Sequence, residues 1–142
     1  MFWFDKQEPH TTYMDIRTFE GELCDGRRFN VNPDVIGDFR NIPFSDNTFD
    51  MVVFDPPHLV KGGDNGWQII KYGRLNKESW EEDIRKGFEE CFRVLKQEGV
   101  LIFKWNEQQI KINEVLPLCP IKPIFGQRGY GKTHWLVFLK SA

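Results

Sequence analysis

The stretch that decides the fold is the ten-residue run Phe49-Asp50-Met51-Val52-Val53-Phe54-Asp55-Pro56-Pro57-His58. Its first six residues are apolar except for Asp50, and they do not alternate with polar ones. This pattern is typical of a strand that is buried on both faces of a sheet. Two consecutive prolines then remove two backbone donors and fix two φ angles. The run therefore predicts a buried strand that ends in a rigid loop at Asp55.

A helix and a second buried strand follow this loop along the chain. Apolar residues recur there at helical spacing, namely Trp80, Ile84, Phe88, Cys91, Phe92 and Leu95. Ser79 and Glu82 form a capping box, and Gly99 stands where the helix is expected to stop. The helix leads directly into the apolar run 100–103. Because strands joined by a crossover helix run parallel, this βαβ unit predicts the α/β class.

Shorter elements are expected on both sides of this unit. In chain order they are a strand at 11–14, an excursion with a small hairpin at 16–32, a strand at 35–38, a helix at about 107–116 ended by Pro117, and an antiparallel hairpin that joins 121–125 to 134–139. The sheet is therefore expected to be mostly parallel, with a C-terminal antiparallel hairpin. A chain of 142 residues and 16.8 kDa accommodates one such domain, over 1–142.

The composition excludes several classes of protein. Hydrophobic residues make up 40% of the chain, including 13 Phe and 5 Trp, which excludes a disordered segment. A net charge of −2 gives no overall basic excess, so a nucleic-acid substrate requires a local patch or a partner. Cys24, Cys91 and Cys119 stand far apart, and the three histidines lack carboxylate partners, so neither a disulfide framework nor a metal site is expected. With no signal-peptide core and no membrane-spanning run, we expect a cytoplasmic protein.

Three acids, Asp15, Asp38 and Asp55, follow the predicted strands. Ligands of open α/β sheets bind beyond the carboxyl ends of the strands. A carboxylate there accepts hydrogen bonds from both ribose hydroxyls, as we expect of Asp15, or from an exocyclic amine, as we expect of Asp38 with Phe39 against the ring. A single acid at a strand end is more often a cap or turn residue. Three acids in successive strands make the ligand-binding interpretation stronger.

The segment from Asp55 to His58 predicts recognition of an amino group. The prolines leave the Pro56 carbonyl outside any helix or ladder, so this carbonyl and the Asp55 carboxylate can accept the two hydrogens of an NH2 group. The ring of His58 can stack on the heterocycle that carries the amine. A proline-stiffened turn without chemical purpose is the alternative.

These residues resemble a known family. The stretch from Asp38 to His58 is similar to the central segment of class I S-adenosylmethionine-dependent methyltransferases, in which an acid precedes a "PFxDxxFD" motif and the next strand ends in the catalytic loop. The stretch Phe92-Arg93-Val94-Leu95-Lys96-Gln97-Glu98-Gly99-Val100-Leu101 resembles the "VLKPGG" turn of the same family. The resemblance implies a Rossmann-like methyltransferase fold and S-adenosyl-L-methionine as cofactor.

The resemblance also assigns roles to residues. It implies that Asp15 and Ile16 bind the ribose, that Asp38 and Phe39 bind the adenine, and that Asp55 contacts both cofactor and substrate. The catalytic loop would be Asp55, Pro56, Pro57 and His58, in the form typical of the branch that methylates exocyclic or amide nitrogen. The implied substrate is nucleic acid (DNA or RNA) first and protein second. His58 departs from the Tyr, Phe or Trp that is usual in this branch.

The start of the chain departs most from the family. Family members have a first strand and a glycine-containing loop before the ribose-binding acid, whereas no glycine precedes Gly21 here. Either Phe2-Trp3-Phe4 is a shortened first strand, or the strand is missing through truncation of the chain at its N-terminus, which we favour. A non-catalytic binding or interaction module of the same fold is the alternative function. The sequence does not decide the oligomeric state.

Two other ligand classes are disfavoured by the sequence. Residues 126–133 match the phosphate-loop pattern GxxxxGKT, but they precede a strand rather than open a helix, so nucleotide hydrolysis is not expected. Nothing near the first strand matches the GxGxxG fingerprint of dinucleotide-binding folds. Basic residues after the catalytic loop, among them Lys71 and Arg74, give this region positive charge that a phosphate backbone could meet.

Overall fold

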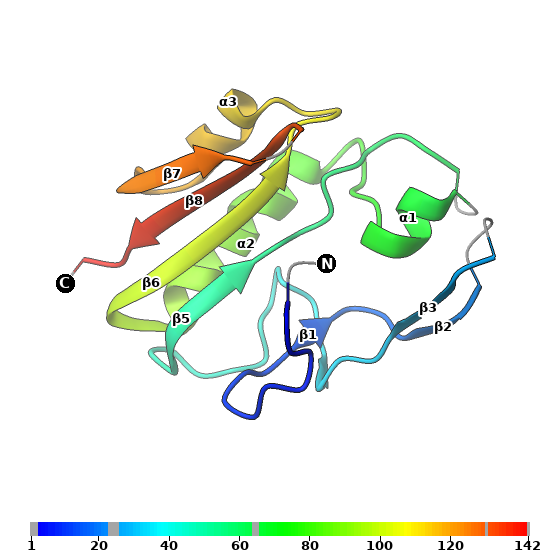
Figure 1. Cartoon of the computed structure of the whole chain (residues 1–142). Helices are drawn as coiled ribbons and strands as arrows, with labels where there is room; N and C mark the ends of the chain where they lie inside the picture. Colours follow the sequence, from blue (N-terminus) through cyan, green and yellow to red (C-terminus); the bar gives the residue numbers. More distant parts are fainter. Residues whose placement is uncertain (1–2, 23–25, 64–65, 130, 142) are drawn as a thin grey trace.

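The computed structural model describes residues 3–22, 26–63, 66–129 and 131–141. A four-stranded sheet in the order β5-β6-β8-β7 forms the main layer, and helix α2 lies across one of its faces (Figure 1). The elements in chain order are β1 (Met14–Asp15), β2 (Phe19–Glu22), β3 (Arg28–Val31), β4 (Val35–Ile36), β5 (Phe49–Phe54), α1 (Trp67–Tyr72), α2 (Trp80–Val94), β6 (Leu95–Asn106), α3 (Ile112–Val115), the 3-10 turn η1 (Leu116–Leu118), β7 (Phe125–Arg128) and β8 (Thr133–Leu139).

The central unit agrees with the prediction. Strands β5 and β6 pair in parallel, with Val52 opposite Leu101 and Phe54 opposite Phe103, and α2 connects them. The apolar residues of α2 are buried against the sheet. Together they form one core, whose fully buried members include Ile84, Phe88, Cys91, Val94, Leu101, Phe103, Trp105 and Phe138. The predicted βαβ unit and the α/β character are therefore confirmed.

The sheet is mixed rather than mostly parallel. Strand β8 pairs antiparallel with β6, and β7 pairs antiparallel with β8, so one of the three pairings in the main sheet is parallel. The other parallel pair, β1 with β4, forms a separate sheet of two-residue strands. The expectation of a mostly parallel sheet is not confirmed, because no strand within the described residues joins β1 to β5.

The start of α2 is confirmed, with Ser79 as its N-cap residue, but the capping box and the C-terminal end differ from the predicted ones. Instead of capping the helix, the Ser79 hydroxyl donates to Asp83 Oδ2 at 2.9 Å, so the capping box with Glu82 is not formed. The helix ends at Val94 and not at Gly99. Its last carbonyls, those of Arg93 and Val94, accept hydrogen bonds from the backbone of residues 47 and 48. This tertiary capping ends the helix one turn before the glycine.

Some of the shorter elements around the central unit have other bounds than those predicted. The excursion does contain an antiparallel hairpin, β2 with β3, as predicted. The helix expected at 107–116 is reduced to α3 and η1, because the Trp105 indole donates to the Ile110 carbonyl and the Glu107 carboxylate caps the Ile112 N–H. Strand β7 begins at Phe125 rather than near residue 121. Pro123 has no N–H to donate to the ladder, which accounts for the later start.

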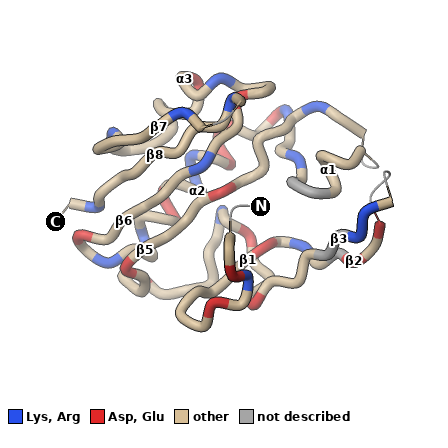
Figure 2. Tube along the Cα trace, in the orientation of Figure 1, with Lys and Arg blue, Asp and Glu red and all other residues tan. Residues whose placement is uncertain are grey.

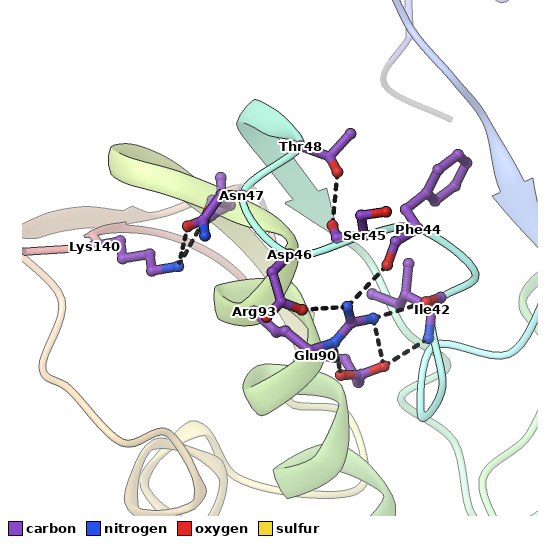
Figure 3. A network of polar contacts seen from close by, with 10 residues as sticks. Ile42, Phe44, Ser45, Asp46, Asn47, Thr48, Glu90, Arg93 and Lys140 are labelled. Carbon is purple, nitrogen blue, oxygen red and sulfur yellow. Dashed lines mark hydrogen bonds and ion pairs between the residues drawn. The ribbon is translucent and has the colours of Figure 1, made fainter.

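A polar network attaches α2 to the loop before β5 (Figure 3). The Arg93 guanidinium donates to the carbonyls of Ile42 and Phe44, both at 2.8 Å, and contacts the carboxylates of Asp46 and Glu90 at 2.8 and 2.5 Å. Glu90 in turn accepts the Ile42 N–H. This network positions the loop from which β5 begins.

Cys91 is buried and Cys119 is half-buried, and both are free thiols, whereas Cys24 lies outside the described residues. Within the described part of the chain, no helix is both long and apolar enough to cross a lipid bilayer.

Candidate functional site

A cavity of about 660 Å³ lies between β5 and β1. It follows β5 from Phe49 to Pro57, and its opposite wall includes residues 14–17, Gly37 and Phe39. Asp15, the last residue of β1, and Asp55, just beyond β5, both line the cavity, and we call the end of the cavity at these two residues its mouth. The volume is within the range of sites that bind cofactors and other small molecules.

Asp55 is the acidic residue of the β5 wall. Its Oδ2 lies 3.7 Å from Nζ of Lys104, which follows Phe103, the partner of Phe54 in the β5–β6 ladder. Figure 2 shows an acidic position just beyond β5 beside a basic position of β6. The side chain of Asp55 is 41% exposed, toward the cavity. Surrounding protein atoms raise the pKa of Asp55 by desolvation, and the positive charge of Lys104 opposes that rise.

The two prolines hold the loop after Asp55 in the cavity wall. Pro56 is buried, and both Pro56 and Pro57 line the cavity. Pro57 packs on Gly73, where an added Cβ would lie 3.3 Å from the proline ring. Beyond them, Gln109 Oε1 accepts the backbone N–H groups of Val60 at 2.7 Å and Lys61 at 2.9 Å. The loop is therefore anchored at its far end by a side chain that follows β6.

His58 lies on the other side of this loop. Its ring meets the Trp105 indole edge-on, with centroids 6.3 Å apart and planes at 73°. Burial, and to a lesser extent the charge of Lys104, lowers the pKa of His58 to about 4, so the ring is neutral at pH 7. His58 is not among the described residues that line the cavity.

Asp15 and Ile16 lie on the β1 wall of the cavity. Asp15 Oδ1 accepts the Arg17 backbone N–H at 3.1 Å and lies 3.7 Å from the Arg17 guanidinium. Both of these contacts with Arg17 use Oδ1 of Asp15. The other carboxylate oxygen of Asp15, Oδ2, is therefore the one that can accept a hydrogen bond from a ligand. Ile16 is 63% exposed beside it.

Asp38 and Phe39 are separated by the structure. Phe39 lines the cavity, but Asp38 does not. The Asp38 carboxylate forms a bidentate ion pair with Arg40, with the shortest contact at 2.6 Å, and it also accepts the Arg40 backbone N–H. These bonds lower the pKa of Asp38. The cavity thus brings together Asp15, Ile16, Phe39, Asp55, Pro56 and Pro57, while Asp38 and His58 lie outside it.

Sequence reasoning missed Arg17, Lys104 and Gln109. Arg17 lines the cavity and its guanidinium donates to the Ile70 carbonyl, which ties the mouth to α1. Lys104 could have been found by aligning the two apolar strands in parallel, because that alignment places it beside Asp55. The residues around Gln109 do not indicate its role, because the two N–H groups that it accepts belong to residues 48 and 49 positions away in the sequence.

A metal centre has no support in the described part of the chain, which contains no group of three or more His, Cys, Asp or Glu side chains able to hold an ion. In the GxxxxGKT-like stretch, residues 126–128 lie in β7, Thr133 begins β8, and the Gly129 N–H donates to the Thr133 carbonyl, so its described residues belong to a hairpin rather than to the start of a helix.

Comparison with known proteins supports the fold. Neither protein-family models nor curated protein sequences give a match. Among solved structures, the chain is similar to the crystal structure of the PH0226 protein from Pyrococcus horikoshii OT3, a protein of methyltransferase fold, with a TM-score of 0.52 and 14% identity. The match covers 76% of this chain and 61% of that one, so this chain spans less than two thirds of its structural neighbour. The protein therefore shares the Rossmann-like α/β fold of this neighbour.

Proposed function

We propose that the protein is an S-adenosyl-L-methionine-dependent methyltransferase that transfers a methyl group to an exocyclic amino or amide nitrogen, with nucleic acid as the first substrate class. The observation that carries the proposal is the position of the Asp55 carboxylate. It stands at the cavity mouth, before two prolines that line the same cavity, and opposite Asp15 on the other wall. The methyltransferase type of the fold supports the choice of reaction.

The residues of the cavity fit the proposed cofactor. Asp15 offers Oδ2 to the ribose hydroxyls, and Ile16 and Phe39 offer apolar surface to the adenosine. Asp38 would serve the adenine amine only after giving up part of its ion pair with Arg40. We therefore expect Asp15 to contribute more to cofactor affinity than Asp38. When bound, the cofactor supplies a methyl group on a positively charged sulfur.

Asp55 and Pro56 have the chemistry to hold the acceptor nitrogen. The ionised carboxylate accepts one N–H of the amino group, and the Pro56 carbonyl accepts the other. With the cofactor bound, the acceptor nitrogen would receive the methyl group as the sulfur leaves, and it would then release one proton. The Asp55 carboxylate is positioned to accept that proton. Lys104 favours the ionised form of Asp55 and so keeps it ready for both roles.

Two arginines, Arg17 and Arg74, line the cavity together with Asp15, Asp50 and Asp55. Guanidinium groups bind phosphate well because of their planar, multiple donors. The two guanidinium groups are the basis for proposing a polynucleotide rather than a free base as substrate.

The test compares Asp55→Asn, just beyond β5, with Asp50→Asn, a matched change near the start of β5. Asp50 is exposed and pairs with Lys96, and it lines the cavity near the start of β5, at the other end of the strand from Asp55. We expect the protein to bind S-adenosylmethionine in calorimetry, and to transfer labelled methyl to DNA or RNA, with a loss of at least about 100-fold in rate for Asp55→Asn only. Equal rates for the two variants would refute the role of Asp55, and transfer to protein alone would refute the nucleic-acid substrate.

The alternative is a non-catalytic binding module of the same fold. The ion pair of Asp38 with Arg40 favours it, because it engages a carboxylate that the family resemblance assigns to the cofactor. Calorimetry separates the two functions, since a module that has lost the cofactor site would give no heat with S-adenosylmethionine or its demethylated product.

A further inference from the structure

The main sheet has one face that packs on α2 and a second face that does not. Side chains along a strand point alternately to the two faces. In β6, Leu101, Phe103 and Trp105 are buried on the side of α2 (Figure 1). Ile102 and Lys104 alternate with them and therefore lie on the second face. Ile102 belongs neither to the hydrophobic core nor to the partly buried residues that pack against it.

A row of side chains crosses this second face near the mouth. Trp135 of β8 is paired with Lys104 of β6 on one side and with Gln127 of β7 on the other. Asp55 continues the row just beyond β5, where its carboxylate lies 3.7 Å from Nζ of Lys104. Neighbouring strands are about 4.8 Å apart, so Trp135 stands two strands, or about 10 Å, from Asp55. The row thus connects the candidate site to an aromatic side chain.

Two aromatic side chains are neighbours on this face. Phe125 of β7 is 65% exposed and lies opposite Val137, which places it diagonally to Trp135. Diagonal neighbours on antiparallel strands are about 7–8 Å apart. Trp135 is half-buried, and its ring centre is 5.8 Å from Nζ of Lys104. Aromatic rings on the face of a sheet bind unpaired bases by stacking, and a nearby cation binds the phosphate that links them.

The C-terminal part of the chain favours an anionic partner. Residues 115–142 contain no Asp or Glu, although the whole chain has a net charge of −2. The basic residues of this segment are Lys122, Arg128, Lys132 and Lys140. Lys132 is exposed in the turn between β7 and β8. Arg128 is 61% exposed and lies 3.8 Å from Glu107, an ion pair of the kind that contributes little at a surface.

The ring that was expected to stack on the substrate is turned away from the candidate site. His58 packs edge-on against Trp105 and is not among the described residues that line the cavity. A polynucleotide with its target amine at Asp55 therefore needs another aromatic surface for its bases. Trp135 meets this need, because the row places it next to Lys104 on the face that Asp55 shares.

We propose that the face of the sheet formed by Lys104, Trp135 and Phe125, called here the aromatic face, binds single-stranded nucleic acid. The target nucleotide lies at Asp55, the phosphate beside it contacts Lys104, and the next bases stack on Trp135 and Phe125. A duplex does not fit this arrangement, because its paired bases are already stacked on one another. The proposal rests on the proposed function in one respect, which is that Asp55 marks the position of the target nucleotide.

The experiment measures binding of a fluorescein-labelled single strand of DNA or RNA by fluorescence anisotropy, without cofactor. The strand has about ten nucleotides, within the range that a single domain covers. Loss of a stacking ring weakens such binding by about fivefold or more, which we expect for Trp135→Leu. Trp135→Phe keeps a ring and should restore most of the affinity. Trp67→Leu, at a tryptophan that is 39% exposed at the start of α1, is the matched control and should bind like the unsubstituted chain.

The salt dependence of binding tests Lys104 separately. Each phosphate that a basic side chain neutralises on a single strand contributes about 0.7 to the slope of log affinity against log salt concentration. We expect Lys104→Met to reduce the slope by about this amount. Lys96→Met, on the same strand but paired with Asp50, should leave the slope unchanged. Phe125→Leu alters an exposed ring and provides a second test of stacking should Trp135→Leu fail to fold.

Four results would overturn the proposal. The first is no binding of the single strand by the unsubstituted chain at low salt. The second is an equal effect of Trp135→Leu and Trp67→Leu, or no effect of either. The third is equally tight binding of a duplex of the same length, which would mean that phosphate is bound without stacking. The fourth is a concentration-dependent dimer in light scattering that the oligonucleotide does not dissociate, because a second copy would then cover the aromatic face.

Failure of the proposed function gives a different result, because the binding measurements require neither cofactor nor methyl transfer. Binding that depends on Trp135, without transfer to the bound strand, would refute the reaction and support the aromatic face. Transfer to a single strand with the same KM in Trp135→Leu would refute the aromatic face and support the reaction.

Discussion

The Nζ atom of Lys104 lies 3.7 Å from Oδ2 of Asp55, and this pair joins two strands whose register places the two side chains next to each other. Desolvation raises the pKa of Asp55, and the lysine partly counters it. The lysine side chain also stands 5.8 Å from the centre of the Trp135 ring. Lys104 therefore connects the proposed catalytic carboxylate to the antiparallel part of the sheet.

Replacing Lys104 by Met is expected to raise the pKa of Asp55 further. Without the nearby positive charge, the ionised carboxylate loses its main favourable interaction, so Asp55 would stay protonated to higher pH. In a methyl-transfer assay, the acidic limb of the pH profile would move to higher pH. A carbon-13 NMR titration of the Asp55 carboxyl measures the shift directly and requires no activity. Lys96→Met, on the same strand and paired with Asp50, is the matched control. An unchanged Asp55 titration in Lys104→Met would contradict the electrostatic role.

His58 is expected to make the protein less stable in acid. Its pKa is about 4 in the folded protein, below its ordinary value of 6.5, so the unfolded chain binds more protons between these values. The contribution is fully present above pH 6.5 and is lost as the pH falls toward 4. Asp55, whose pKa is raised, acts in the opposite sense. His58→Phe keeps a ring against Trp105 but removes the titration.

Urea unfolding at pH 7 and pH 4.5 checks this prediction. The loss of unfolding free energy on acidification should be smaller in His58→Phe by on the order of 1–2 kcal/mol, once solvent screening is allowed for. His10→Phe, at a side chain that is 92% exposed, should behave like the unsubstituted protein. The same pH dependence in all three proteins would show that burial of His58 does not control it.

Gln109→Ala is expected to release the loop that follows the two prolines. The substitution removes the acceptor of two backbone N–H groups, those of Val60 and Lys61, and a donor to the Lys61 carbonyl. We expect a loss of about 1–2 kcal/mol in unfolding free energy and faster hydrogen exchange at Val60 and Lys61. Gln108→Ala, at the exposed neighbouring position, is the control. Exchange that is unaffected at both amides would mean that buried Leu59 holds the loop without the glutamine.

Arg93→Lys is expected to destabilise the protein although the charge is retained. The planar guanidinium binds two carbonyls and two carboxylates at once (Figure 3), which an ammonium group cannot reproduce. The expected loss is about 2 kcal/mol in thermal or urea unfolding. Arg28→Lys affects an exposed ion pair with Glu20 and should change stability by less than about 0.5 kcal/mol. Similar effects of the two substitutions would argue against a structural role for the network.

The central βαβ unit could be predicted because its signals are local. An uninterrupted apolar run and a helical period are both visible within twenty residues, and burial of those residues then fixes the pairing of β5 with β6. The predicted start of α2 after Ser79 is confirmed, but its capping box and its stop at Gly99 were wrong, because the Ser79 hydroxyl bonds to Asp83 and the last carbonyls bond to the loop at residues 47–48. The hydrogen-bond partners of the helix ends depend on tertiary contacts, which the sequence of the helix does not contain.

Sequence reasoning could predict those site residues whose position depends only on the end of a strand. Asp15 and Asp55 follow strands that face one cavity, so the rule for open sheets brings them together. Asp38 lies two residues beyond its strand, and Arg40 turns back to pair with it, which the rule does not consider. Lys104 and Gln109 depend on strand register and on a contact between distant loops, which one sequence does not display.

The position of the two prolines has a consequence for solubility. An exposed strand edge recruits edges of other molecules, and the apolar run of β5 has the composition of an aggregation-prone segment. Pro56 and Pro57 have no N–H groups, so an intermolecular ladder cannot extend past Phe54 on that side, and exposed Asp50 places a charge near the other end. The residues that shape the proposed catalytic loop therefore also restrict β5 from starting a fibril while its edge is uncovered.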